Sequence, residues 1–263
     1  RARSVLRRSC IPGGYDILEK FPIYTSRLSK IINKDSFDSQ SDNHLTIITT
    51  NYDVVAEFAL HSIGLTAFAP GVNVSSGRPC FYREGASNVT LCKLHGSANW
   101  RSPDLGCIEC DDYLHPSQIV DKNHSSQNIH LPRSWVDDLD GSAAGFGWPE
   151  DPMIIPPTLY KAESHAGMRP AWRAAGKALR ESSRIIFVGF SFPESDTYLK
   201  YFMGTCLRDN FSAEQIEIVD PSAGQVINKI SSKDFGFGAT IREKLVAIES
   251  KWEQAMIRPL YGT

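Results

Sequence analysis

The chain has 263 residues, 41% of them hydrophobic, which is enough for one sizeable core or for one core with a small inserted module. Lys and Arg (28) nearly balance Asp and Glu (30), and the resulting net charge of -2 excludes a global basic field that would recruit nucleic acid or an anionic membrane. No apolar run is long enough for a membrane span, and six scattered cysteines make no disulfide framework, so we expect a reducing, cytoplasmic setting.

Residues 1–44 are expected to form an N-terminal helical segment of a truncated domain. Apolar residues at Tyr24, Leu28, Ile31 and Ile32 recur at helical spacing and predict a surface helix. The chain starts with Arg1 rather than Met, so we expect a piece of a longer polypeptide.

A short β-rich run, Leu45–Thr50, is followed directly by a cluster of polar residues. Asn51 and Asp53 lie at a strand-to-helix turn, because residues 54–59 then carry an apolar stripe at helical spacing. The turn alone leaves two interpretations of Asp53 open, a helix N-cap and a residue of a ligand site.

A second apolar run, Val89–Leu94, ends in His95 and Gly96. We expect His95 at the carboxyl edge of a sheet, which is where open α/β sheets bind ligands. Imidazole exchanges a proton near neutral pH, so His95 is a candidate catalytic base, with a structural histidine as the alternative.

Residues 101–149 show no sustained periodicity and are rich in Asp, Gly, Ser and Pro. A stretch of this length is too long for a connecting loop, so it predicts an insert or lid. Cys107 and Cys110 form a C-x-x-C pair within it. A structural zinc site usually needs two such pairs, so we interpret these residues as reduced cysteines; a metal site completed by a histidine of the insert is the alternative.

The C-terminal half continues the alternation of strands and helices. Arg184–Gly189 is apolar and β-branched, as expected for a strand that helices cover on both faces. The strand ends at Gly189, and Ser191 follows shortly after it. A glycine at the end of a strand and before a helix lets a ribose or phosphate approach the backbone closely. Ile216–Asp220 predicts the next strand, and the apolar spacing over residues 241–256 predicts a last helix.

Strands that alternate with helices predict an α/β fold with a doubly wound, mostly parallel Rossmann-like sheet. Several of these strands end in polar residues or glycine, and the carboxyl ends of parallel strands meet at one edge of a sheet. We therefore expect a single site formed by Asn51, Asp53, His95, Gly189, Ser191 and Asp220.

These motifs resemble the sirtuin superfamily, in particular its bacterial sirtuin-like branch of NAD-consuming and defence-associated proteins. Thr49–Asp53 is similar to the sirtuin Thr-Gln-Asn-Ile-Asp motif, and Lys93–Ser97 matches the segment that carries the catalytic His. Val188–Phe192 corresponds to the Gly-Thr-Ser segment. Features of the sirtuin-like branch are found at Ile154–Pro157 and Pro193–Asp196.

The resemblance implies a sirtuin-like Rossmann domain over residues 45–263, with the insert at 101–149. It also implies cleavage of the nicotinamide–ribose bond of NAD, which is then a substrate. Asn51 would position a water or the ribose, His95 would act as the base, and Asp53 would orient the pocket. The other residues that the resemblance places near NAD are Thr49, Thr50, Gly96, Gly189, Ser191 and Asp220.

If water is the acceptor, the protein is an NAD hydrolase, which could be part of a defence protein. If an acyl-lysine is the acceptor, the protein is a protein deacylase. The hydrolase is favoured because the zinc module that shapes the peptide cleft of deacylases is incomplete. The alternative from another class is a non-catalytic module that binds NAD or ADP-ribose and reports it to a partner.

Two departures from the family pattern lead to further expectations. The family's first strand ends in a Gly-Ala-Gly turn, but no apolar run precedes Gly13-Gly14 here, so we expect that strand upstream of Arg1. The 263-residue chain alone should then bind NAD weakly or not at all and show little hydrolysis. Thr50 replaces the motif's glutamine, and the second cysteine pair is missing. We expect additional domains or chains as partners, and neither a membrane nor nucleic acid.

Overall fold

The computed structural model describes residues 28, 30–32, 43–74, 81–85, 87–97, 99–102, 108–110, 153–155, 166–194, 196–232, 235, 237, 239–257 and 259–260. The chain divides into two compact units, and one boundary between them falls within helix α6 (Arg169–Glu181), between Ala171 and Trp172. Strands β1 to β5 belong to the first unit and β6 to β8 to the second. Both units contain parallel strands and helices, which confirms the expected α/β, Rossmann-like class.

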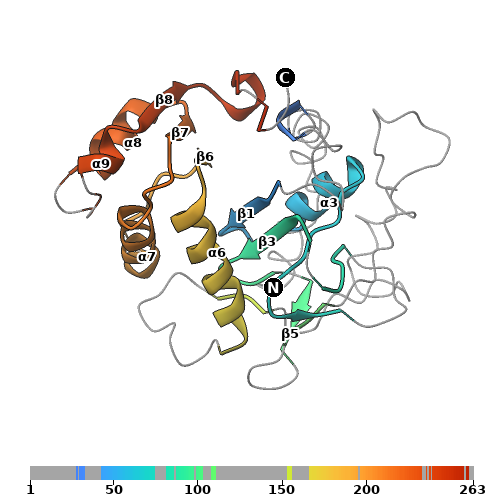
Figure 1. Cartoon of the computed structure of the whole chain (residues 1–263). Helices are drawn as coiled ribbons and strands as arrows, with labels where there is room; N and C mark the ends of the chain where they lie inside the picture. The colour runs from blue at the N-terminus through green and yellow to red at the C-terminus, as the bar shows by residue number, and fades with distance from the viewer. Residues whose placement is uncertain are drawn as a thin grey trace, which may run out of the picture. The chain divides into compact units, whose positions relative to one another are not determined.

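The first unit is built on a parallel pair of strands, β1 (Leu45–Thr49) and β3 (Val89–Lys93). Thr49 lies opposite Lys93 at the end of the ladder, and the backbone N–H of Leu94 donates to the carbonyl of Thr49 at 2.9 Å. Helix α3 (Val55–Ser62) follows β1. The segments that leave the two strands therefore start from the same edge, as Figure 1 shows.

A second, small sheet lies in the first unit, in the order β2 (Val72–Asn73), β5 (Ile108–Cys110), β4 (Trp100–Arg101). β5 is parallel to β2 and antiparallel to β4. Trp100 and Ile108 are buried within it. These strands have only two or three residues each, which is too short for a periodic sequence signal, and β5 lies inside the stretch interpreted as an irregular insert.

The second unit contains a parallel three-stranded sheet in the order β6 (Arg184–Val188), β7 (Gln215–Asp220), β8 (Leu245–Glu249). The central strand β7 is almost fully buried. The described residues after 165 include the helices α6 (Arg169–Glu181), α7 (Thr197–Arg208), α8 (Ala223–Ile230) and α9 (Ala239–Arg242) and 3-10 turns at Ala166–Met168 and Trp252–Gln254. Helix α8 packs against β7 and β8.

One sequence prediction for this unit is wrong. Residues 241–256 do not form one helix, because Leu245–Glu249 is a strand that pairs in parallel with β7. Pairing with a buried neighbour stabilises the extended backbone over a segment whose apolar spacing also suits a helix. On β6, Phe187 is buried and Val188 is 40% exposed, and the cover of both faces by helices stays a prediction.

The described parallel strands lie in three separate sheets, two in the first unit and one in the second. The family's first strand, expected upstream of Arg1, stays a prediction, as do the domain boundary at residues 44/45 and the insert at 101–149. Across the part of the chain that the structure describes, no helix has both the length and the apolar character that crossing a membrane requires.

Candidate functional site

The turn after β1 is held by its own side chains. Thr49 Oγ1 accepts a hydrogen bond from the backbone N–H of Asn51 at 3.0 Å, and Asp53 Oδ1 accepts one from the N–H of Val55 at 3.0 Å. The N-cap position of α3 is Val54, so the N-cap interpretation of Asp53 is off by one residue, although its carboxylate still satisfies a helix donor. The Asn51 residue is exposed, so its amide is accessible to a ligand.

His95 lies in a tight turn two residues beyond the end of β3. Its carbonyl accepts from the N–H of Ile155 at 2.8 Å, and the N–H of Ser97 donates to the carbonyl of Met153 at 2.9 Å. The His95 residue is only 4% exposed, and its ring centroid lies 6.3 Å from that of Tyr52. Because Tyr52 neighbours Asn51, this contact brings the turn after β1 against the turn that carries His95.

Gly96 has a conformational reason to be glycine. Its φ of +83° lies in the left-handed region, and a Cβ built on it would be 1.9 Å from the carbonyl oxygen of Met153. The backbone around His95 is therefore fixed by direct contact with the Met153–Ile155 segment. The role of Gly96 in NAD binding stays a prediction.

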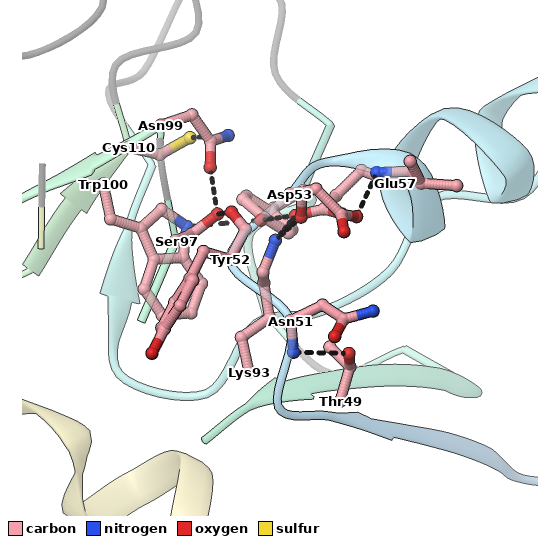
Figure 2. Close-up of polar contacts among 12 residues, drawn as sticks. Thr49, Asn51, Tyr52, Asp53, Glu57, Lys93, Ser97, Asn99, Trp100 and Cys110 are labelled. Carbon is pink, nitrogen blue, oxygen red and sulfur yellow. Dashed lines mark hydrogen bonds and ion pairs between the residues drawn. The ribbon is translucent and has the colours of Figure 1, made fainter. Parts of the chain in front are cut away.

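A buried polar chain continues from this turn to the small sheet. Ser97 Oγ lies 2.6 Å from Asn99 Oδ1 and 3.4 Å from the carbonyl of Tyr52, and its single proton serves one of these acceptors at a time. The amide of Asn99 donates to Cys110 Sγ at 3.5 Å. Figure 2 shows these contacts from Tyr52 to Cys110.

The candidate metal ligands are only partly described. Cys110 is buried and accepts a hydrogen bond, and Cys107 lies outside the described residues. Within those residues no group of three or more His, Cys, Asp or Glu side chains could hold a metal ion.

Sequence reasoning missed a buried ion pair beneath the turn. Lys93 Nζ lies 2.8 Å from Glu57 Oε1, and both side chains have no exposed surface. The same ammonium donates to the backbone carbonyl of Asp53. Tyr82 donates to Glu57 Oε1 at 2.6 Å and accepts from Trp100 Nε1 at 3.2 Å. The signal in the sequence was a single charged residue in each of two runs that are otherwise uncharged and mostly apolar: Glu57 in residues 54–60 and Lys93 in residues 89–94.

Burial dominates the electrostatics of Asp53. It raises the pKa of the Asp53 carboxyl above its ordinary value, while the hydrogen bond from Val55 and the charge of Lys93 act in the opposite direction. Asp53 therefore combines a half-buried carboxyl with a backbone carbonyl that accepts a hydrogen bond from the Lys93 ammonium. Its position suits it to orient the turn.

The other predicted residues lie at strand ends of the second unit. Gly189, with φ +58°, follows β6, and a Cβ built on it would meet no atom within 4 Å, so its α carbon faces open space. The carbonyl of Ser191 accepts from Lys229 Nζ at 3.3 Å. Asp220 ends β7, and its Oδ1 accepts from the N–H of Ser222 at 2.8 Å.

The first unit thus brings together the turns of Asn51, Asp53 and His95, and the second holds Gly189, Ser191 and Asp220. Their union in one site stays a prediction. The residues present fit a ribose-containing ligand in two respects: an exposed Asn51 on a turn that contacts the turn of His95 in one unit, and an uncovered glycine at a strand end in the other.

A family model for the SIR2-like domain matches residues 45–229, which is well over half of the chain. A search of the curated proteins finds no match. Proteins of the matched family are generally NAD-dependent enzymes, so the function of this chain is of the sirtuin-like, NAD-related kind. The match confirms the resemblance drawn from the strand-end motifs, and the chain belongs to the SIR2-like domain family.

Proposed function

We propose that the protein is an NAD hydrolase that cleaves the bond between nicotinamide and ribose. The observation that carries the proposal is the contact between two turns, one with the exposed Asn51 and the other with His95, at the same end of the β1–β3 ladder. An amide that positions a small nucleophile and an imidazole that accepts its proton are the two groups that such a hydrolysis needs.

In this reaction the bond from C1′ of the ribose to the nicotinamide nitrogen breaks, and its electron pair leaves with nicotinamide. An oxygen of water bonds to C1′, and its proton passes to the imidazole of His95 and then to solvent. The products are nicotinamide, ADP-ribose and one proton. Asn51 orients the water or the ribose, and Asp53 maintains the turn.

The burial of His95 supports water as the acceptor over acyl-lysine. A residue that is 4% exposed leaves little room for the peptide that carries an acyl-lysine, whereas a water molecule needs only a small space. A defence setting and a cytoplasmic location are part of the same proposal, supported by the resemblance to the bacterial sirtuin-like branch and by the scattered cysteines.

The test follows free nicotinamide while NAD is incubated with the longest native polypeptide that contains these residues. His95→Ala should lower turnover by about 10²–10⁴-fold, the usual contribution of a general base. His44→Ala, an exposed histidine before β1, is the matched control and should keep wild-type turnover.

Because His95 is buried, the unfolding transition of each variant is recorded beside its activity. Wild-type turnover in a folded His95→Ala protein would refute the role of His95. NAD binding by the wild-type protein without nicotinamide release would favour the non-catalytic sensor instead, and release that requires an acyl-lysine peptide would favour the deacylase.

A further inference from the structure

The buried pair of Lys93 and Glu57 is a feature of the first unit that the proposed chemistry does not use. Its atoms lie 2.8 Å apart, and neither side chain has exposed surface, so neither can touch a substrate directly. Glu57 Oε2 has no hydrogen-bond partner among the described residues. Two buried charges of this kind contribute little net stability compared with apolar residues of the same volume, so stability alone does not account for them.

The pair joins the two turns of the candidate site. Lys93 is the last residue of β3, two positions before His95, and its ammonium donates to the carbonyl of Asp53, two positions after Asn51. Glu57, in the first turn of α3, holds that ammonium in place. Figure 2 shows Lys93 reaching from its strand to the Asn51–Asp53 turn and to Glu57.

We propose that Lys93, held by Glu57, is a positioning residue that sets the Asn51–Asp53 turn against His95. The inference rests on the proposed function, because it assigns the pair to the geometry of the same site. The Lys93 ammonium donates to the backbone carbonyl of Asp53 in the place that a water molecule would otherwise take. Because the Lys93 side chain is fully buried, this contact holds the end of the turn against the core. Loss of this donor leaves Asn51 on a turn that is attached to β3 by fewer contacts.

The deciding variant is the double substitution Lys93→Met with Glu57→Gln. Lys93→Met alone leaves a buried carboxylate without its compensating charge and should destabilise the protein. The double variant removes both charges, and the amide oxygen that Glu57→Gln introduces still accepts from the hydroxyl of Tyr82. It should therefore unfold at a temperature close to that of the wild type, although the carbonyl of Asp53 lacks its ammonium donor.

A positioning role predicts that the double variant recovers the stability of the wild type but not its activity. In the double variant, kcat for nicotinamide release should remain about 10–100-fold below that of the wild type, which is the scale of a misplaced reacting group. KM for NAD should change far less, since the turn acts mainly in the transition state. A double variant that regains both kcat and the unfolding temperature would overturn the proposal.

The chain offers a matched control in the second unit. Arg184 and Glu217 form a similar ion pair at 2.8 Å, with side chains 18% and 3% exposed. It lies at the start of β6, at the opposite end of the strand from Gly189. Arg184→Met with Glu217→Gln should leave kcat unchanged, and an equal loss of activity in this control would overturn a specific role for Lys93.

Hydrogen exchange of the peptide that covers residues 49–57 gives a readout independent of activity. Exchange should be faster in the Lys93→Met/Glu57→Gln variant and unchanged in the Arg184→Met/Glu217→Gln control. If the wild-type protein releases no nicotinamide, the proposed function fails, and exchange alone decides the positioning role. Equal protection of residues 49–57 in wild type and double variant would overturn it.

Discussion

Replacement of Gly96 by alanine should be far more destabilising than the same change at Gly85. Both glycines have positive φ, +83° and +78°, so alanine at either position incurs the left-handed penalty of about 1–2 kcal/mol. They differ in their surroundings. A Cβ at Gly85 meets no atom within 4 Å, whereas a Cβ at Gly96 would be 1.9 Å from the carbonyl oxygen of Met153.

Relief of that contact must move backbone rather than a flexible side chain. The Cβ to oxygen distance has to increase from 1.9 Å to at least 3.0 Å. Such a shift disrupts the hydrogen bonds from Ser97 N–H to Met153 and from Ile155 N–H to His95, at 2.9 and 2.8 Å. At about 1 kcal/mol for each bond, we expect a total loss near 3–4 kcal/mol for Gly96→Ala, against about 1–2 kcal/mol for Gly85→Ala.

Urea unfolding of the wild type and of both variants measures these losses, provided that the dependence on denaturant is the same for all three proteins. The difference between the variants should be about 2 kcal/mol, the value of the two hydrogen bonds. Nicotinamide release should also fall in Gly96→Ala, because His95 moves with its neighbour. Equal losses of stability at the two positions would show that Gly96 is required for its φ alone and would refute the contact argument.

Two further predictions concern the turn after β1. Asn51→Ala should lower kcat much more than it weakens NAD binding, because a residue that places the attacking group acts in the transition state; an unfolded variant, seen by circular dichroism, would instead assign Asn51 a structural role. Asp53→Asn should remove a pH dependence of stability. Burial raises the pKa of Asp53 in the folded state above its ordinary 3.8, so the contribution of this group is largest below that pH and decreases as pH rises through the raised value. The free energy of unfolding of the wild type minus that of Asp53→Asn should therefore fall from acidic to neutral pH, and a rise would contradict the burial argument.

Local sequence patterns were sufficient for the features that depend on near neighbours. The apolar run before Asn51 forms β1, the run before His95 forms β3, and these two strands pair in parallel as the alternating order predicts. The run that ends in Asp220 is the buried centre of its sheet. In each case a mostly apolar, β-rich segment followed by polar residues leaves few alternatives to a strand that ends at a turn.

The same reasoning failed where two local structures fit one pattern. The apolar residues from Ile241 to Trp252 have helical spacing, yet Leu245–Glu249 extends because β7 offers a parallel neighbour. The hydrogen bonds and side-chain contacts of that pairing come from a strand far away along the chain. No window of sequence around β8 contains them.

The strand-end motifs by themselves determined the family and the candidate residues Asn51 and His95, because these depend on residue type and order. Only the tertiary structure decided how they are held. The contact of Lys93 with Asp53 spans 40 positions and that with Glu57 spans 36. A buried charge is tolerated only when a partner lies beside it, and the partners of Lys93 come from other parts of the chain. The sequence of β3 alone therefore does not explain why a lysine is buried in it.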